Sequence, residues 1–205
     1  MGAQRAGPPL QRARAAIILV HGRGSSGQEI PGLSRAFDAP ADAALIAPNA
    51  TRGTWYPQRF LAPLENNEPW LGSALEVVDE LVREAQANGI PFERIGLVGF
   101  SQGACLILEY TMRQPRRFGF VAGLSGALIG PPGTPRPVVD LQQTPVLIAC
   151  AEHDAHVPVR FVEQSAASFS GSGAVVTKQI FPCAAHTVFP EEIERIRPRA
   201  RFDVP

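Results

Sequence analysis

Residues 99–103 read Gly-Phe-Ser-Gln-Gly, and this match to the pattern Gly-x-Ser-x-Gly makes Ser101 a candidate nucleophile. The motif directly follows an apolar run, 94–98, that is typical of a buried strand, and residues 104–112 behind it contain no helix breaker and predict a helix. A serine at such a strand-to-helix turn has a strained backbone that exposes its hydroxyl, and glycines two residues before and after it leave room for the bend. The N-terminus of the helix would place partial positive charge beside the serine.

A serine hydroxyl needs a neighbouring base to lose its proton near neutral pH, and that base is normally a histidine oriented by a carboxylate. His186 stands on a loop after the strand predicted at 175–181, and Asp154 follows the strand predicted at 145–150. The three residues follow one another in the chain as serine, acid and histidine, and each lies beyond the carboxyl end of a successive strand. This is the order of an α/β-hydrolase triad. Because the carboxyl ends of parallel strands meet at one edge of a sheet, we expect Ser101, Asp154 and His186 to lie together.

A serine nucleophile that attacks a carbonyl group also needs amide donors for the oxyanion that forms. His21 begins the sequence His-Gly-Arg-Gly at the carboxyl end of the first predicted strand, where an early loop contributes one backbone N–H. Gln102, the residue after the candidate nucleophile, would supply the second N–H. Loss of a single such donor costs about 2.7–4 kcal/mol in another hydrolase, so the pair would contribute several kcal/mol. We therefore assign His21 a structural role rather than that of the base.

The alternation of strand-like and helical segments predicts an α/β fold. Several apolar runs are continuous, which indicates a mostly parallel sheet covered by helices on both faces. The predicted strands are 15–20, 43–47, 94–98, 119–124, 145–150 and 175–181. Besides the helix behind Ser101, helices are predicted near 69–85, from Pro158 and after Pro190. A chain of 205 residues with 45% hydrophobic content suits one domain, for which we predict the bounds 15–205, with 1–14 as an N-terminal extension.

Composition and cysteine usage exclude several classes of protein. Lys+Arg and Asp+Glu both number 19, so the formal charge of zero provides no basic field for nucleic acid. No stretch approaches the roughly 20 apolar residues that cross a bilayer, so we predict no stable membrane association. The short apolar run near the N-terminus is predicted as a strand rather than as a signal peptide. Cys105, Cys150 and Cys183 are odd in number and lie in apolar segments, which favours reduced thiols and a cytoplasmic protein.

Some reactive side chains have simpler explanations than a second site. His153, Asp154 and His156 could be taken for metal ligands, but their loop offers neither a cysteine nor helical spacing, so we expect no metal and no other cofactor. Cys105 lies one helical turn beyond the candidate nucleophile and is predicted to pack against the sheet rather than to react. The side chain of Arg23 could grip an anionic substrate, although a solvated arginine at the rim of the site is favoured.

These residues resemble the phospholipase/carboxylesterase family of α/β-hydrolases, which includes acyl-protein thioesterases and small bacterial carboxylesterases. The resemblance runs from about Ile17 to Glu192. The matching residues are His-Gly-Arg-Gly at 21–24, Trp55-Tyr56, Gly-Phe-Ser-Gln-Gly-Ala at 99–104, Asp154 with Val157-Pro158 behind it, and His186. Two positions depart from the family pattern: Arg23 stands where the family often has an aliphatic residue, and Ala-Glu-His at 151–153 replaces a glycine-led approach to the acid.

The resemblance implies a compact α/β-hydrolase fold with a mostly parallel central sheet and no separate lid domain. It implies Ser101 as nucleophile, Asp154 as acid and His186 as base, with the amides of Arg23 and Gln102 as oxyanion donors. No cofactor is called for. The leading function is a serine carboxylesterase that hydrolyses small to medium acyl esters through an acyl-serine intermediate, acting on a small-molecule substrate.

Several alternatives to this function stay open. An acyl-protein thioesterase or a lysophospholipase would use the same triad, and a lactone or carbon–carbon hydrolase could also use this fold. A non-catalytic binding protein is disfavoured because every triad candidate is present. A homodimer is possible, but no interface can be located in the sequence.

The segment 51–70 follows the second predicted strand and carries apolar side chains of two possible uses. Trp55, Tyr56, Phe60 and Leu61 could form an apolar wall for the acyl chain, or they could seal the core beneath a long loop, and both interpretations stay open. No insertion is long enough for a lid, which predicts an open site that favours small soluble esters.

Overall fold

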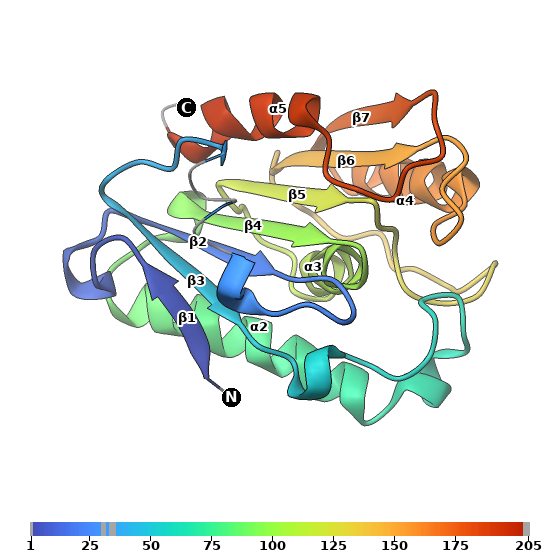
Figure 1. The fold of residues 1–205 in the computed structure, drawn as a ribbon, viewed down its shortest axis with the longest axis horizontal. Helices are drawn as coiled ribbons and strands as arrows, with labels where there is room; N and C mark the ends of the chain where they lie inside the picture. The colour runs from blue at the N-terminus through green and yellow to red at the C-terminus, as the bar shows by residue number, and fades with distance from the viewer. Residues whose placement is uncertain (1, 30–31, 33–35, 203–205) are drawn as a thin grey trace.

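A computed structural model describes residues 2–29, 32 and 36–202. In this part of the chain, seven strands form one sheet in the order β1-β3-β2-β4-β5-β6-β7 (Figure 1). The strands are β1 (Ala3–Ala6), β2 (Ala15–Val20), β3 (Ala43–Pro48), β4 (Ile95–Phe100), β5 (Phe120–Leu124), β6 (Pro145–Ala151) and β7 (Val175–Phe181). All neighbouring strands are parallel except β1 and β3. The predicted mostly parallel α/β sheet is thus confirmed.

Helices cover both faces of the sheet, as the continuous apolar strands require. The helices are α2 (Trp70–Ala87), α3 (Gln102–Arg113), α4 (Val159–Gly171) and α5 (Pro190–Ala200). One hydrophobic core lies between the sheet and α2, α3 and α4, whereas α5 closes a second core on the opposite face. The helix predicted near 69–85 is present as α2, and it buries one apolar stripe because residues three and four apart share a helix face.

The N-terminal segment belongs to the sheet. Residues 1–14 were expected to precede the domain, but Ala3–Ala6 pairs with β3, with Ala3 opposite Pro48 and Ala6 opposite Leu45. This strand is short and contains Gln4 and Arg5, so it lacks the apolar run that marks the buried strands. An edge strand has one neighbour and a solvated side, and its sequence therefore gives little signal.

The carboxyl ends of the parallel strands lie at one edge of the sheet, and the arrowheads of β4, β6 and β7 point toward that edge in Figure 1. The strand β4 extends two residues beyond its predicted end at Val98 and leads directly into Ser101. The connection from β5 to β6 contains no α-helix, so no lid is inserted there. No helix in the described ranges combines the length and apolar character needed to span a membrane.

Candidate active site

Ser101 occupies the sharp turn between β4 and α3 in a conformation that L-residues rarely adopt, with φ at 53° and ψ at −118°. Its two flanking glycines are required by close backbone approach. A Cβ on Gly99 would lie 2.5 Å from the carbonyl oxygen of Gly103, and a Cβ on Gly103 would overlap the carbonyl oxygen of Val20 at the end of β2. The turn therefore has the strained strand-to-helix geometry that the motif predicts, and it exposes the Ser101 hydroxyl at the edge of the sheet.

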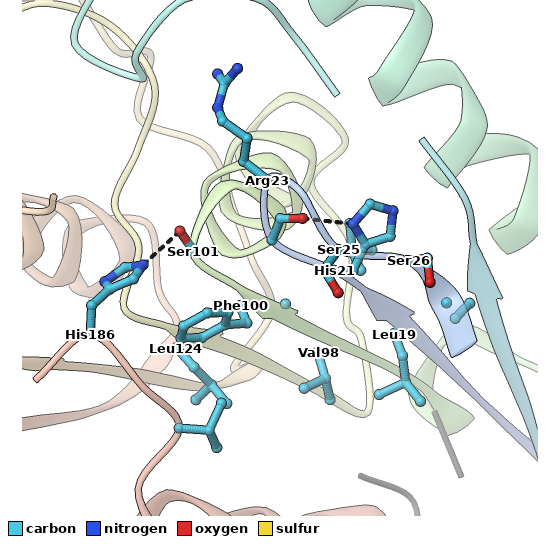
Figure 2. Close-up of a pocket in the computed structure, with 16 residues that line it drawn as sticks. Leu19, His21, Arg23, Ser25, Ser26, Val98, Phe100, Ser101, Leu124 and His186 are labelled. Carbon is cyan, nitrogen blue, oxygen red and sulfur yellow. Dashed lines mark hydrogen bonds between the residues drawn. The ribbon is translucent and has the colours of Figure 1, made fainter. Parts of the chain in front are cut away.

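Three side chains from separate loops form one hydrogen-bonded row at this edge. His186 Nε2 lies 2.8 Å from Ser101 Oγ, and Figure 2 shows the two side chains pointing toward each other. His186 Nδ1 lies 2.7 Å from Asp154 Oδ2 on its other side. The structure thus brings together the serine, histidine and aspartate that the sequence placed after β4, β7 and β6.

Asp154 is buried and is held by several hydrogen-bond donors. Its Oδ1 accepts the backbone N–H groups of His156, at 2.8 Å, and Val157, at 3.0 Å, while the Cys150 thiol lies 3.5 Å from Oδ2. Burial by itself would raise the pKa of Asp154, but hydrogen bonds from His186 and the two amides outweigh it and hold the pKa below its usual value. Asp154 is therefore an ionised acceptor near neutral pH.

The ionised aspartate determines which nitrogen of His186 carries the proton. A carboxylate only accepts hydrogen bonds, so Nδ1 must be the donor to Asp154 Oδ2. In neutral imidazole the other nitrogen, Nε2, is then an acceptor and can receive the Ser101 hydroxyl proton. This arrangement can activate a serine hydroxyl as a nucleophile.

The residues that carry the candidate oxyanion donors, Arg23 and Gln102, line one cavity together with Ser101. Gln102 is the first residue of α3, so its amide belongs to the helix end whose N–H groups have no intrahelical acceptor. Arg23 lies on the loop after β2. Neither amide has a hydrogen-bond acceptor within the described ranges. As expected for an arginine at the rim of the site, Arg23 is exposed and lines both cavities beside Ser101. Its guanidinium also donates to the backbone carbonyls of residues 56–58, which the sequence did not indicate.

An apolar cavity of about 450 Å³ opens beside Ser101 and His186. Figure 2 shows the aliphatic and aromatic side chains on one side of Ser101, whereas the guanidinium of Arg23 points away from them. The labelled side chains are those of Leu19, Val98, Phe100 and Leu124, and Val188 also lines the cavity. Most of them stand at the carboxyl ends of central strands, where the sequence indicated only buried core. These cavity-lining residues could have been identified from the sequence by their position at the end of a strand close to Ser101.

A second, more polar cavity of about 410 Å³ also borders Ser101. Of the four residues predicted as an acyl wall, Tyr56 and Phe60 line this cavity, while Trp55 and Leu61 line neither of the two. Trp55, Tyr56 and Phe60 are each at most 6% exposed and belong to the core between the sheet and α2. The aromatic segment therefore mainly seals the core, and the apolar surface beside Ser101 comes from the strand ends.

The remaining reactive groups do not form a second site. Burial raises the pKa of the Cys105 thiol to about 12, and its sulfur accepts the Ala127 N–H, so it packs as predicted rather than acting as a nucleophile. All three cysteines are free. The described ranges contain no group of three His, Cys, Asp or Glu side chains placed to hold a metal ion.

Comparison with known proteins identifies the family of the chain. A family profile described as Phospholipase/Carboxylesterase matches residues 3–199. A crystal structure of a phospholipase/carboxylesterase from Dyadobacter fermentans DSM 18053 is 38% identical with a TM-score of 0.90, and the alignment covers 97% of this chain and 95% of that one.

The chain also resembles curated proteins at lower identity. Acyl-protein thioesterase 1 of Eremothecium gossypii is 32% identical over 131 residues, which cover 57% of this chain and 56% of that protein. A protein of Oryza sativa subsp. japonica named a probable carboxylesterase is 28% identical over 89% of this chain and 75% of its own length. The chain thus spans just over half the length of the first of these relatives. With its profile match, its sheet and the serine turn at Ser101, the chain belongs to the phospholipase/carboxylesterase family of α/β-hydrolases.

Proposed function

We propose that this protein is a serine carboxylesterase in which Ser101 is the nucleophile, His186 the general base and Asp154 the group that orients the histidine. The observation that carries the proposal is the continuous hydrogen-bonded row from Ser101 Oγ through His186 to Asp154 Oδ2, with separations of 2.8 and 2.7 Å. An ionised Asp154 keeps the proton on Nδ1 and stabilises the imidazolium that forms during the reaction.

In the acylation step, Ser101 Oγ attacks the ester carbonyl carbon while His186 Nε2 takes the hydroxyl proton. The oxyanion of the tetrahedral intermediate accepts hydrogen bonds from the amides of Arg23 and Gln102. The carbon–oxygen bond to the alcohol then breaks, and His186 returns its proton to that oxygen. Water repeats the sequence on the acyl-serine and releases the carboxylic acid. Each step uses residues of this chain alone.

The apolar cavity beside Ser101 would receive the acyl chain. Each methylene that enters it contributes about 0.8 kcal/mol, so kcat/KM should rise up to about fourfold per added carbon until the cavity is filled. A panel of p-nitrophenyl esters from acetate to palmitate tests this. Val188→Phe, which fills part of the cavity, should shift the preferred chain to a shorter length, whereas Val138→Phe at an exposed position should leave the profile unchanged.

Thioester hydrolysis is the second candidate function, and the likeness to acyl-protein thioesterase 1 favours it. Its chemistry would use the same groups, so the panel should include acyl thioesters of matched chain length. A kcat/KM at least tenfold higher for thioesters than for the matched esters would replace the carboxylesterase assignment. Loss of both activities in Ser101→Ala is expected in either case.

Location and assembly remain predictions. Three free cysteines support the predicted cytoplasmic location, because exported proteins more often pair them. The homodimer that the sequence leaves open has no interface assigned to it.

A further inference from the structure

The carbonyl oxygen of Tyr56 joins the two residues that carry the candidate oxyanion donors. It accepts hydrogen bonds from Arg23 Nη2 at 2.9 Å and from Gln102 Nε2 at 2.8 Å. Tyr56 is 1% exposed and Gln102 is 7% exposed, so this junction is protected from solvent on the Gln102 side. A single backbone oxygen therefore connects the loop after β2 with the first turn of α3.

The Arg23 guanidinium makes further bonds to the same loop. Its Nη1 donates to the carbonyl of Pro57 at 3.1 Å, and its Nη2 also donates to the carbonyl of Gln58 at 2.8 Å. One side chain thus binds three successive carbonyls. A planar guanidinium with several fixed N–H groups suits this geometry, and a lysine ammonium does not reproduce it.

The Gln102 side chain reaches the loop through both of its polar atoms. Besides the bond to Tyr56, its Oε1 accepts the Trp55 N–H at 3.1 Å. This paired contact fixes the orientation of the first residue of α3 relative to the loop.

The loop also holds the residues on either side of Arg23. The Trp55 indole N–H donates to the carbonyl of His21 at 2.8 Å, and the Gly24 N–H donates to the carbonyl of Gly53 at 2.8 Å. The short segment around Arg23 lies outside any helix or strand, so these bonds and the guanidinium supply its order. Oxyanion donors act through their preorganised positions, and a displaced amide loses much of its effect.

We propose that the guanidinium of Arg23 is a positioning group for the oxyanion hole. Its hydrogen bonds to the segment 55–58, which also binds the Gln102 side chain, hold the backbone amides of Arg23 and Gln102 in fixed relative positions. This inference rests on the proposed function. The guanidinium of Arg23 points away from the apolar cavity in Figure 2, and it donates three hydrogen bonds to the protein's own backbone. Arg23 therefore contributes to turnover through loop geometry rather than through a contact with the acyl chain.

The test compares Arg23→Leu and Arg23→Lys with Arg117→Leu. Arg117 is a half-buried arginine that also donates to a backbone carbonyl, that of Gln142, but it precedes β5 at the amino end of the sheet. With neutral p-nitrophenyl butyrate, Arg23→Leu should lower kcat by about 10- to 100-fold with KM within about threefold of wild type. The kcat of Arg23→Lys should lie between those of Arg23→Leu and wild type. The kcat of Arg117→Leu should match wild type.

A transition-state analogue separates positioning from a general structural effect. Ser101 Oγ adds to the carbonyl carbon of an alkyl trifluoromethyl ketone, its proton passes to His186, and the carbonyl oxygen becomes an oxyanion. The inhibition constant for this ketone should rise by the same factor as kcat/KM falls in both Arg23 variants, because both depend on the oxyanion donors. Thermal unfolding temperatures report separately on stability.

Several outcomes would overturn the inference. A kcat of Arg23→Leu within about twofold of wild type would overturn it, as would an effect on KM alone. A loss of activity only toward esters that carry a negative charge would also overturn it, because that result indicates substrate recognition by the Arg23 guanidinium. If Arg23→Leu does not fold, unchanged kcat and ketone affinity in Arg23→Lys would be decisive against it. An active wild type with unimpaired Arg23 variants removes only this inference, whereas a wild type without Ser101-dependent turnover removes the proposed function as well.

Discussion

The replacement Asp154→Asn tests how the buried acid controls the base. Two backbone N–H groups, from His156 and Val157, both donate to Asp154 Oδ1. In the variant, the side-chain carbonyl oxygen must occupy that position, because an NH₂ group there would face two donors. The side-chain NH₂ is then directed at His186 Nδ1, where the aspartate now accepts a hydrogen bond.

This orientation imposes the wrong tautomer on the histidine. With the amide donating to Nδ1, the proton of neutral His186 moves to Nε2, which then faces Ser101 Oγ as a donor and cannot accept its proton. A wrong tautomer in a serine hydrolase lowers kcat by roughly 10⁴-fold, which corresponds to about 5.4 kcal/mol of barrier. We expect a loss of this size for Asp154→Asn.

Steady-state hydrolysis of p-nitrophenyl butyrate at pH 7.5 measures the loss, with circular dichroism as the control for folding. Asp154→Ala provides the matched comparison, because it removes the carboxylate without a donor that enforces the wrong tautomer. We expect Asp154→Ala to keep at least as much activity as Asp154→Asn. A folded Asp154→Asn variant with more than a tenth of wild-type kcat would refute the tautomer argument.

Two further predictions concern stability. Gly103→Ala should destabilise the protein by more than about 3 kcal/mol or prevent folding, because the new Cβ would overlap the Val20 carbonyl. Gly171→Ala, at an open site, should leave the stability unchanged or increase it. Urea denaturation measures both free energies of unfolding. Burial raises the pKa of Glu192 from 4.5 to about 7, so between these pH values the folded protein retains a proton that the unfolded chain has released, and stability falls as pH rises. The unfolding free energy of Glu192→Gln should therefore improve relative to wild type by up to about 3 kcal/mol between pH 5 and pH 8, and parallel pH profiles for the two proteins would contradict this.

Much of the fold follows from local sequence signals. The continuous apolar runs of β2, β4 and β6 predict buried parallel strands, and the helix stripe of α2 has the expected period. Because parallel strands end at one edge, positions after β4, β6 and β7 were enough to expect that Ser101, Asp154 and His186 would meet.

Other features depend on tertiary contacts that no local pattern records. The edge strand Ala3–Ala6 has its register from β3 rather than from its own residues. Leu19 and Leu124 have the same apolar character as any core position, so their place in the cavity beside the serine depends on where the strands end. The three carbonyl bonds of Arg23 depend on the path of the loop 55–58, which is determined by its hydrogen bonds to distant residues.

The central claim is that His186 activates Ser101 as a nucleophile, and active-site labelling tests it most directly. The wild-type protein is treated with a fluorophosphonate, digested and analysed by mass spectrometry, alongside Ser101→Ala and His186→Ala. We predict one adduct per chain, on Ser101, with no adduct in Ser101→Ala and labelling slowed by at least about 10³-fold in His186→Ala. A folded wild-type protein that remains unlabelled, or that carries the adduct on another residue, would contradict the account.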